Sequence, residues 1–223
     1  MEQGAGNSAD GNVLIVTAVE AERNALLRGL GNGSPFDVLA GGVGPAAAAA
    51  SAAARMARRR YRLAICAGIG GGFPGRAELG TLVVADEVAA ADLGAEAPEG
   101  FLPLERLGFG SSRIRTDAER SDRLAEALRG AGLPVVVGPV LTVSCATGTA
   151  ETAKARAMRV PGAAAEAMEG FGVAVAAQNM GIPFLEIRAV SNPVGPRNRG
   201  AWKIEAALER LAEAGAVIRE VFG

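Results

Sequence analysis

Short apolar, β-rich segments alternate with helical segments along almost the whole of this 223-residue chain. Val13 to Thr17 predicts a buried strand, Glu20 to Leu30 a helix, and Phe36 to Ala40 a second strand. Because this alternation is typical of parallel sheets covered by helices, we expect an α/β fold: a single-domain, three-layer α/β/α sandwich with a largely parallel, twisted central sheet. No linker, repeat or charge run divides the chain. Residues 13–223 are therefore predicted to form one domain, after a polar, Gly-rich and disordered segment at residues 1–12.

The same patterns predict the remaining elements. Further helices are expected at Pro45 to Arg60, Ser121 to Arg129, Glu151 to Met158, Ala164 to Gly181 and Trp202 to Val221. Further strands are expected at Leu63 to Ala67, Leu82 to Val88, Val135 to Cys145 and Pro183 to Val190. The irregular segment Ala89 to Ser112 is long enough to be a candidate lid.

The chain contains no histidine, which excludes Ser-His-Asp and Cys-His catalysis and any histidine-ligated metal. Acid–base chemistry must then fall to carboxylates, Lys, Tyr, Cys or water. Cys66 and Cys145 lie far apart and outside any metal-ligand motif, which is typical of thiols in a reducing compartment. We expect neither a metal nor a cofactor.

The charges nearly balance, with 23 Lys and Arg against 24 Asp and Glu. Nucleic acids and anionic membranes are bound by basic surfaces, so neither is an expected partner. No charge-free apolar stretch reaches the roughly 20 residues that span a bilayer, and residues 1–12 lack the apolar core of a signal peptide. We therefore expect a soluble, cytoplasmic protein.

Ligands of open α/β sheets bind at the carboxyl ends of the strands, where two glycine-rich segments occur. Gly42-Val43-Gly44-Pro45-Ala46-Ala47 fits GxGxxA, and Gly70 to Gly75 fits GxGxxG. The acidic residue that a dinucleotide site needs about 20 positions later is missing. Three interpretations stay open: dinucleotide binding, tight turns that bring backbone amides close to another ligand, and purely structural turns.

Four glutamates and one arginine are candidate functional residues. Glu20 and Glu22 begin a helix, where a carboxylate is either solvated or functional. Glu166 and Glu169 lie in a very apolar segment, where a carboxylate is costly unless it is paired or functional. Arg188 ends an apolar strand, as a buried ion-pair partner or a substrate residue. Carboxylates with an arginine and no histidine suit hydrolysis of a glycosidic bond.

A set of ordered motifs adds a resemblance that covers the chain from Val13 onward. The motifs are Thr17-Ala18-Val19-Glu20-Ala21-Glu22, Gly42-Val43-Gly44, Ala67-Gly68-Ile69-Gly70-Gly71, Met168-Glu169-Gly170 and Ile187-Arg188-Ala189-Val190-Ser191-Asn192. They resemble purine nucleosidases related to methylthioadenosine/S-adenosylhomocysteine nucleosidase, in the nucleoside phosphorylase superfamily. The tail from Ser191 to Arg199, with Trp202, looks most like the futalosine hydrolases. This resemblance implies cleavage of futalosine to hypoxanthine and dehypoxanthinyl futalosine in a route to menaquinone, a nucleoside phosphorylase-like fold, and a homo-oligomer.

The resemblance also implies roles for individual residues, with Glu22, Asn192 and Arg188 as the catalytic set. Glu22 matches the glutamate that activates the attacking water, and Arg188 an arginine near that water. Glu169 matches the glutamate that binds the ribose hydroxyls, and Met168 a methionine packed on the ribose.

The base site departs from the adenine-specific nucleosidases. Ser191 and Asn192 fall where those enzymes place a serine and a purine-facing aspartate. An Asn amide can turn its NH₂ toward N7 and O6 of hypoxanthine, but it does not by itself exclude adenine. Ile69 stands where a serine would lie beside the water, and Gly70 follows it as a further substrate-binding residue. Backbone groups of Gly148 and Thr149 are expected at the purine, in place of a stacking aromatic ring.

Other functions remain open at this level. A methylthioadenosine-type nucleosidase would share the motifs, and a purine nucleoside phosphorylase would need basic and hydroxyl side chains for phosphate where Glu22 and Ile69 stand. A non-catalytic nucleotide-binding module would use the two glycine segments. Candidates for binding the carboxylate of futalosine's aromatic 5′ substituent are Arg113, Arg115, Arg197 and Arg199.

Overall fold

The computed structural model describes residues 12–31, 35–98 and 100–223. The disorder expected for the N-terminal segment lies outside these residues, except at Asn12, which begins strand β1 (Asn12–Thr17). Helix α1 (Glu20–Leu30) and strand β2 (Phe36–Ala40) have the bounds that the sequence predicts. β1 and β2 pair in parallel, as a strand–helix–strand unit requires.

The central strand of the sheet is β3 (Tyr61–Gly72), which has three neighbours. β12 (Phe184–Pro193) pairs with nearly its whole length, β1 with its first half, and β11 (Ala165–Ala167) with its last two residues. The strand order is β8-β5-β10-β11-β3-β12-β4-β9, with β1 and β2 branching from β3. The bounds of the others are Leu82–Val84 for β4, Glu87–Ala90 for β5, Arg113–Arg115 for β8, Val135–Val137 for β9 and Val140–Thr142 for β10.

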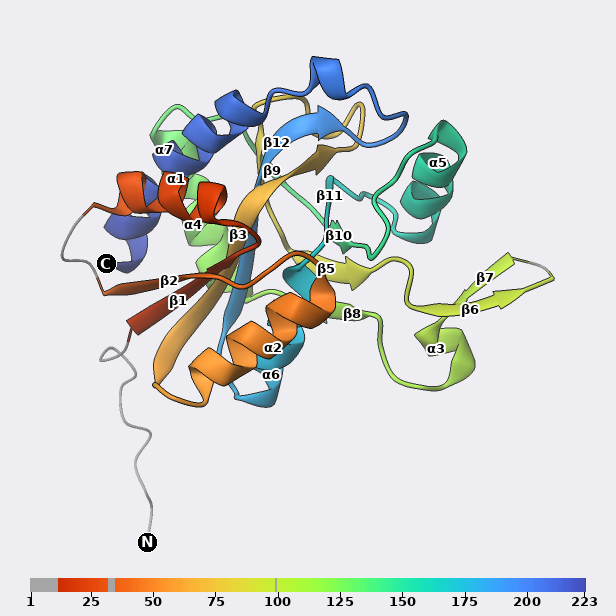
Figure 1. Ribbon diagram of the computed structural model, residues 1–223, viewed down its shortest axis with the longest axis horizontal. Helices are drawn as coiled ribbons and strands as arrows, with labels where there is room; N and C mark the ends of the chain where they lie inside the picture. Colours follow the sequence, from red (N-terminus) through yellow and green to blue (C-terminus); the bar gives the residue numbers. More distant parts are fainter. Residues whose placement is uncertain (1–11, 32–34, 99) are drawn as a thin grey trace, which may run out of the picture.

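Helices cover both faces of this sheet, which confirms the predicted three-layer α/β/α architecture (Figure 1). One apolar core joins the sheet to α1, α4 (Ala118–Gly130) and α7 (Ile204–Phe222). A second core joins the opposite face to α2 (Pro45–Met56) and α6 (Gly170–Asn179). Most strand pairs are parallel, and the exceptions are β11 with β3, β12 with β4, and β5 with β8.

The glycine segment at residues 68–72 continues strand β3, whereas the sequence predicts a turn there. Its glycines allow close approach between neighbouring chains. A Cβ on Gly68 would lie 2.6 Å from Oε1 of Glu22, and one on Gly72 would lie 2.0 Å from the carbonyl oxygen of Ala77. The segment therefore needs small residues for packing and does not need them for a turn.

The helix predicted from Ala164 to Gly181 is wrong in its first part. Residues Ala165–Ala167 form β11 between β10 and β3, and α6 begins only at Gly170. Alanine favours a helix, but here the pairing of both strand edges outweighs that local preference.

Two predicted strands are each divided in the structure. The segment Leu82 to Val88 separates into β4 and β5, and Val135 to Cys145 separates into β9 and β10 around Gly138-Pro139. β4 pairs with β9, and β5 pairs with β10, so both segments cross from one part of the sheet to another. Proline has no N–H for a strand ladder, which favours the second break.

The remaining elements lie around the sheet. They are the hairpin of β6 (Gly94–Ala97) and β7 (Gly100–Pro103), α3 (Leu104–Leu107), α5 (Ala150–Arg159) and a 3₁₀ turn, Arg199–Ala201. The hairpin extends away from the sheet (Figure 1). α2 ends at Met56, before the arginine-rich turn that the sequence places in the helix.

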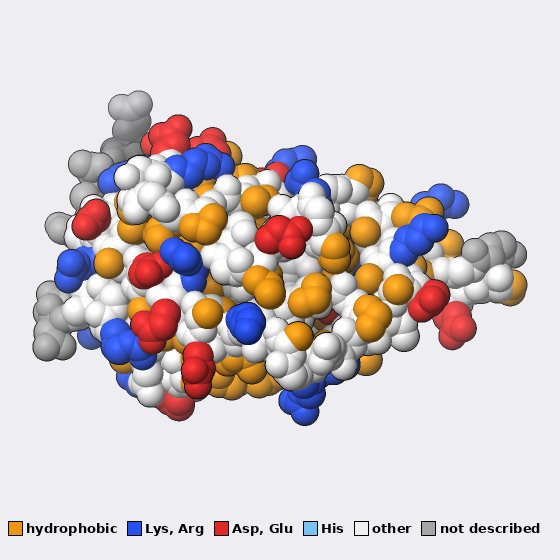
Figure 2. Space-filling view, turned by 90° about the horizontal axis from the view of Figure 1, so that it is seen from above, with side chains coloured by type: hydrophobic (Ala, Val, Ile, Leu, Met, Phe, Trp, Pro, Cys, Tyr) orange, Lys and Arg blue, Asp and Glu red, His pale blue; other side chains and the backbone are white. Residues whose placement is uncertain are grey.

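Surface charge agrees with the balanced composition. On the face seen in Figure 2, acidic and basic side chains are interspersed, without a large area of one sign. Among the helices of the described residues, none is both long and apolar enough to cross a bilayer.

Candidate active site

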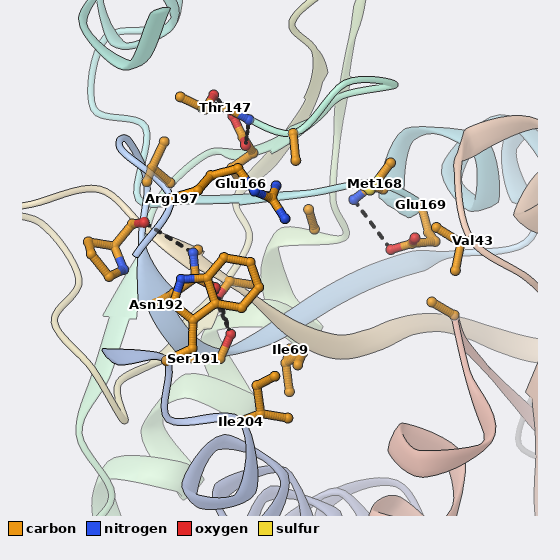
Figure 3. A pocket seen from close by; sticks show the side chains of 18 of the residues that line it. Val43, Ile69, Thr147, Glu166, Met168, Glu169, Ser191, Asn192, Arg197 and Ile204 are labelled. Atoms are coloured by element: carbon orange, nitrogen blue, oxygen red, sulfur yellow. Dashed lines mark hydrogen bonds between the residues drawn. The ribbon is translucent and has the colours of Figure 1, made fainter. Parts of the chain in front are cut away.

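A cavity of about 270 Å³ opens at the carboxyl ends of β1, β3 and β12, where the fold predicts a ligand (Figure 3). Its volume is near the lower end of the roughly 300–1,000 Å³ typical of small-molecule sites. The residues that line it are Ala18, Val19, Glu22, Val43, Ile69, Gly70, Gly71, Ala146, Thr147, Glu166, Ala167, Met168, Glu169, Ser191, Asn192, Pro193, Val194, Gly195, Arg197, Trp202 and Ile204. The predicted site residues in this wall are Glu22, Ile69, Gly70, Met168, Glu169, Ser191 and Asn192.

The carboxylate of Glu22 is fixed by backbone amides in the cavity wall. Its Oε2 accepts hydrogen bonds from the N–H groups of Ala18 and Val19, at 2.9 and 3.2 Å. Its Oε1 accepts one from the N–H of Ile69, at 2.9 Å. Because a carboxylate oxygen can accept two hydrogen bonds, Oε1 keeps one acceptor position for a ligand or water. Glu22 is only 4% exposed, so this charge is directed into the cavity and away from bulk solvent.

Glu169 directly precedes the first residue of α6 and faces the glycine loop that leads into α2. Its Oε1 accepts a hydrogen bond from the N–H of Gly44 at 3.1 Å, and its Oε2 accepts one from Met168 at 3.3 Å. Gly44 has a φ of 93°, in the left-handed region that favours glycine, so the loop can turn its N–H toward the carboxylate. The glycine segment at residues 42–44 thus positions a carboxylate.

Arg188 lies behind the cavity wall and is 1% exposed. Its guanidinium forms ion pairs with Glu186 (Nε to Oε1, 2.7 Å) and with Glu169 (Nη1 to Oε2, 3.2 Å). Nη2 donates to the sulfur of Cys66 at 3.0 Å. Burial raises the pKa of the Cys66 thiol, so this sulfur is a neutral acceptor. The structure therefore brings Arg188 to Glu169, as a group that orients the carboxylate.

Asn192 presents an amide with one hydrogen left for a ligand. Its Nδ2 donates to the carbonyl oxygen of Pro193 at 3.0 Å, and its Oδ1 lies 2.9 Å from the hydroxyl of Ser191. Figure 3 shows both contacts at one side of the cavity. The carbonyl oxygen of Pro193 can only accept a hydrogen bond, so it fixes the NH₂ group on its own side of the amide and Oδ1 on the side of Ser191.

The wall opposite Asn192 contains Thr147 and Glu166 (Figure 3). The carboxylate of Glu166 accepts hydrogen bonds from the backbone N–H of Thr147, at 2.7 Å, and from its hydroxyl, at 2.5 Å. It also forms a buried ion pair with Arg156 at 2.8 Å. The segment after β10 therefore places Ala146 and Thr147 at the cavity. Gly148 and Thr149, which are predicted there from the sequence, do not line it, because Thr149 caps the start of α5.

The segment between β12 and α7 closes the cavity with an aromatic ring and a guanidinium. Trp202 and Arg197 both line the cavity, and the guanidinium carbon of Arg197 lies 5.1 Å from the Trp202 ring centre. Within the described residues, Arg197 forms no ion pair. Arg113, by contrast, is paired with Glu87.

The described residues contain no cluster of three or more His, Cys, Asp or Glu side chains arranged to hold a metal ion. What they offer is a set of anionic and amide groups around a small, mostly apolar space. Glu22 and Glu169 can stabilise positive charge on a sugar ring, and Glu22 can accept a proton from water. This is the arrangement that glycosidic hydrolysis through an oxocarbenium-like transition state needs.

The family model of the phosphorylase superfamily matches residues 15–222, and the chain belongs to this superfamily. A protein of Acidothermus cellulolyticus is 49% identical over 92% of this chain and 89% of its own length. One of Streptomyces coelicolor is 48% identical over 91% of this chain and 93% of its own. Both are named futalosine hydrolase, and the chain is a member of the family that they represent.

The fold is also that of a solved nucleosidase structure. The methylthioadenosine/S-adenosylhomocysteine nucleosidase of Neisseria meningitidis, in complex with methylthio-immucillin-A, has a TM-score of 0.81 and 18% identity to this chain. The likeness covers 95% of this chain and all of that structure. It confirms the nucleoside phosphorylase-like fold.

Glu186 belongs to the site, although its sequence position does not mark it as a candidate. It is fully buried, and this burial raises the pKa of its carboxyl. The positive charge of Arg188 has the opposite, smaller effect on that pKa. A Cβ on Gly170 would lie 1.8 Å from its Oε2, so α6 begins with a glycine against this carboxylate. The signal was the spacing of Glu186 and Arg188, which puts both on one face of a strand.

Proposed function

We propose that this protein hydrolyses the N-glycosidic bond of a purine nucleoside, with futalosine as its substrate. One observation carries the proposal: Glu22 and Glu169 are held in one cavity, and the amide of Asn192 faces the same space. The high identity to futalosine hydrolases supports the substrate. The release of hypoxanthine would then serve the route to menaquinone that this substrate implies.

In the proposed reaction, Glu22 binds a water through the free acceptor position of Oε1. The water oxygen bonds to C1′ of the ribose while the C1′–N9 bond breaks, and Glu22 takes the water proton. Glu169 accepts hydrogen bonds from the ribose hydroxyls, with Met168 packed beside the sugar. Arg188 orients Glu169 from behind, through the ion pair at 3.2 Å.

The purine leaves with the electron pair of the broken bond. The free N–H of Asn192 binds N7 or O6 and stabilises that negative charge, because an amide cannot supply a proton as an acid does. Water then protonates the departing base. Ile69 adds an apolar contact beside the sugar, where its N–H already holds Glu22.

The 5′ substituent of futalosine ends in an aromatic carboxylate, for which four arginines are sequence candidates. Arg197 is the one of these that lines the cavity, where it lies over the ring of Trp202. We therefore assign the carboxylate to Arg197, and the substituent would pack against Trp202.

We also propose a cytoplasmic location and a homo-oligomeric state. Cys66 and Cys145 are free thiols, which is typical of a reducing compartment. The oligomer follows from the resemblance to the nucleosidases. Light scattering of the purified protein at several concentrations measures its mass, and a single-chain mass at all of them would contradict the oligomer.

The nearest competing function is phosphorolysis. Both reactions release hypoxanthine from futalosine, but only phosphorolysis needs inorganic phosphate. We expect the same rate of hypoxanthine release with phosphate and after its removal, and a free sugar as the second product. Release that requires phosphate and gives a sugar 1-phosphate would show that the protein is a phosphorylase.

A further inference from the structure

Glu166 is a buried carboxylate in the cavity wall that the proposed bond cleavage does not use. It is 7% exposed and belongs to β11, and it lies beside Thr147, apart from Glu169 (Figure 3). Burying a carboxylate in an apolar strand costs free energy unless it is paired. The ion pair with Arg156 offsets this cost, but it uses only one of the two carboxylate oxygens.

The register of the sheet places Glu166 and Asn192 at two sides of one space. Glu166 pairs with Gly71 from one neighbouring strand of β3, and Asn192 pairs with Gly71 from the other. Residues in register on adjacent strands share a face, and two strand spacings separate these two by about 10 Å. Gly71 has no side chain, and a Cβ there would lie 3.2 Å from Nδ2 of Asn192. The space between the carboxylate and the amide can therefore hold a flat ring, with a hydrogen bond at each edge.

Glu166 retains one acceptor position on its carboxylate, and the backbone N–H of Thr147 beside it already donates to this carboxylate. Its Oε2 accepts from the hydroxyl of Thr147 and from Arg156, while its Oε1 accepts only from the N–H of Thr147. An ionised carboxylate has about four such positions, so one remains on Oε1. The N–H of Thr147 is consequently occupied, and it cannot bind a ring nitrogen that lacks a hydrogen.

These groups distinguish the two common purine edges. A 6-oxopurine carries a hydrogen on N1 and an acceptor at O6, whereas adenine has a bare, accepting N1 and an amino group. The free N–H of Asn192 can bind N7 or O6 of a 6-oxopurine, but an Asn amide also fits the edge of adenine. Opposite Glu166, the N1–H of a 6-oxopurine can donate a hydrogen bond to the carboxylate. The bare N1 of adenine would instead face a lone pair of the carboxylate, and the two acceptors would repel each other.

We propose that Glu166 determines base specificity by accepting a hydrogen bond from N1–H of a 6-oxopurine. This inference rests on the proposed function, since it concerns the base that the same cavity releases. It assigns the selection against adenine to Glu166, which Asn192 alone does not supply. Arg156 pairs with Oε2 of this carboxylate at 2.8 Å, on the atom that does not face the proposed hydrogen bond.

The wild-type protein gives the first test, by calorimetric binding of hypoxanthine, 1-methylhypoxanthine and adenine. The methyl group replaces the N1 hydrogen. We expect hypoxanthine to bind at least about tenfold more tightly than either of the others, because a hydrogen bond to a charged group is lost. Equal affinity for hypoxanthine and its 1-methyl derivative would overturn the proposal without a variant.

The second test compares Glu166→Gln with Glu151→Gln, an equivalent change at an exposed residue of α5 that does not line the cavity. We expect Glu166→Gln to lower the ratio of hypoxanthine to adenine affinity by about 10- to 100-fold, and Glu151→Gln to leave it unchanged. An equal loss for both bases would mean that Glu166 only supports the segment around Thr147, which contradicts the proposal.

These outcomes separate the inference from the function on which it rests. If wild-type protein releases hypoxanthine from futalosine but Glu166→Gln keeps the same base ratio, only the assignment of Glu166 fails. If wild-type protein binds no hypoxanthine and releases none from futalosine, the proposed function fails, and the assignment with it.

Discussion

Replacement of Glu22 by Gln tests both the structure and the chemistry of the site. The carboxylate accepts three backbone hydrogen bonds, from Ala18, Val19 and Ile69. A Gln side chain can place its single oxygen toward Ala18 and Val19, but its NH₂ group then faces the N–H of Ile69. One buried donor is left unpaired, which costs about 1–3 kcal/mol of unfolding free energy.

Two measurements follow from this one substitution. For a chain of this size, each kcal/mol lowers Tm by roughly 2–4 °C, so we expect a fall of about 2–12 °C in a thermal melt. Loss of the group that takes the water proton lowers kcat for futalosine by about 10²- to 10⁴-fold. Glu20→Gln is the matched control in the same helical turn. The Glu20 side chain is 70% exposed, so its replacement should change neither measurement appreciably.

The result that refutes this reasoning is specific. If Glu22→Gln retains turnover within a few-fold of wild type, Glu22 does not activate the water. If its Tm equals that of Glu20→Gln, the three hydrogen bonds do not hold the carboxylate as described.

Three further predictions concern separate parts of the molecule. Burial and the hydrogen bond to Asp37 raise the pKa of Tyr61, the single tyrosine, to about 12 from its usual 10.0. The neutral form of Tyr61 therefore contributes stability that is fully present below pH 10 and is lost as the pH rises toward 12. In a pH titration of the folded protein, tyrosinate absorbance should appear at a higher pH in wild type than in Asp37→Asn. Asn192→Asp should lower the ratio of futalosine to methylthioadenosine turnover by about 10- to 100-fold in a competition assay, and an unchanged ratio would remove Asn192 from base selection. Gly68→Ala would place a Cβ 2.6 Å from Oε1 of Glu22; we expect at least about a tenfold loss of kcat with the fold retained in circular dichroism, and full activity would contradict the close packing.

The sequence predicts the elements whose ends are marked locally. α1 and β2 have their predicted bounds, because a β-rich run and a polar helix start leave clear signals in the residues themselves. The pairing of β11 leaves no such signal: Ala165 to Ala167 becomes a strand only because β10 and β3 lie on either side. Likewise, the glycines between residues 68 and 72 predict a turn from sequence alone. Only the fold shows that they belong to a strand and are needed because Glu22 and Ala77 pack closely against it.

Some residues of the site can likewise be predicted from sequence motifs, and others become apparent only in the fold. Glu22, Glu169 and Asn192 stand in motifs, and the structure brings all three to one cavity. Gly148 is displaced from that cavity by the helix start at residue 149, which sequence spacing alone does not reveal. The contacts of Glu166 join segments 10 and 19 residues apart, so its role as an acceptor became visible only with the fold.

The central claim is tested most directly by the base that the protein releases from a panel of nucleosides. Futalosine, inosine and methylthioadenosine are incubated separately with the wild-type protein, without phosphate, and the free base is quantified by chromatography. The account predicts that futalosine yields hypoxanthine at the highest rate and that methylthioadenosine yields little adenine. Release of adenine from methylthioadenosine, with futalosine left intact, would contradict it.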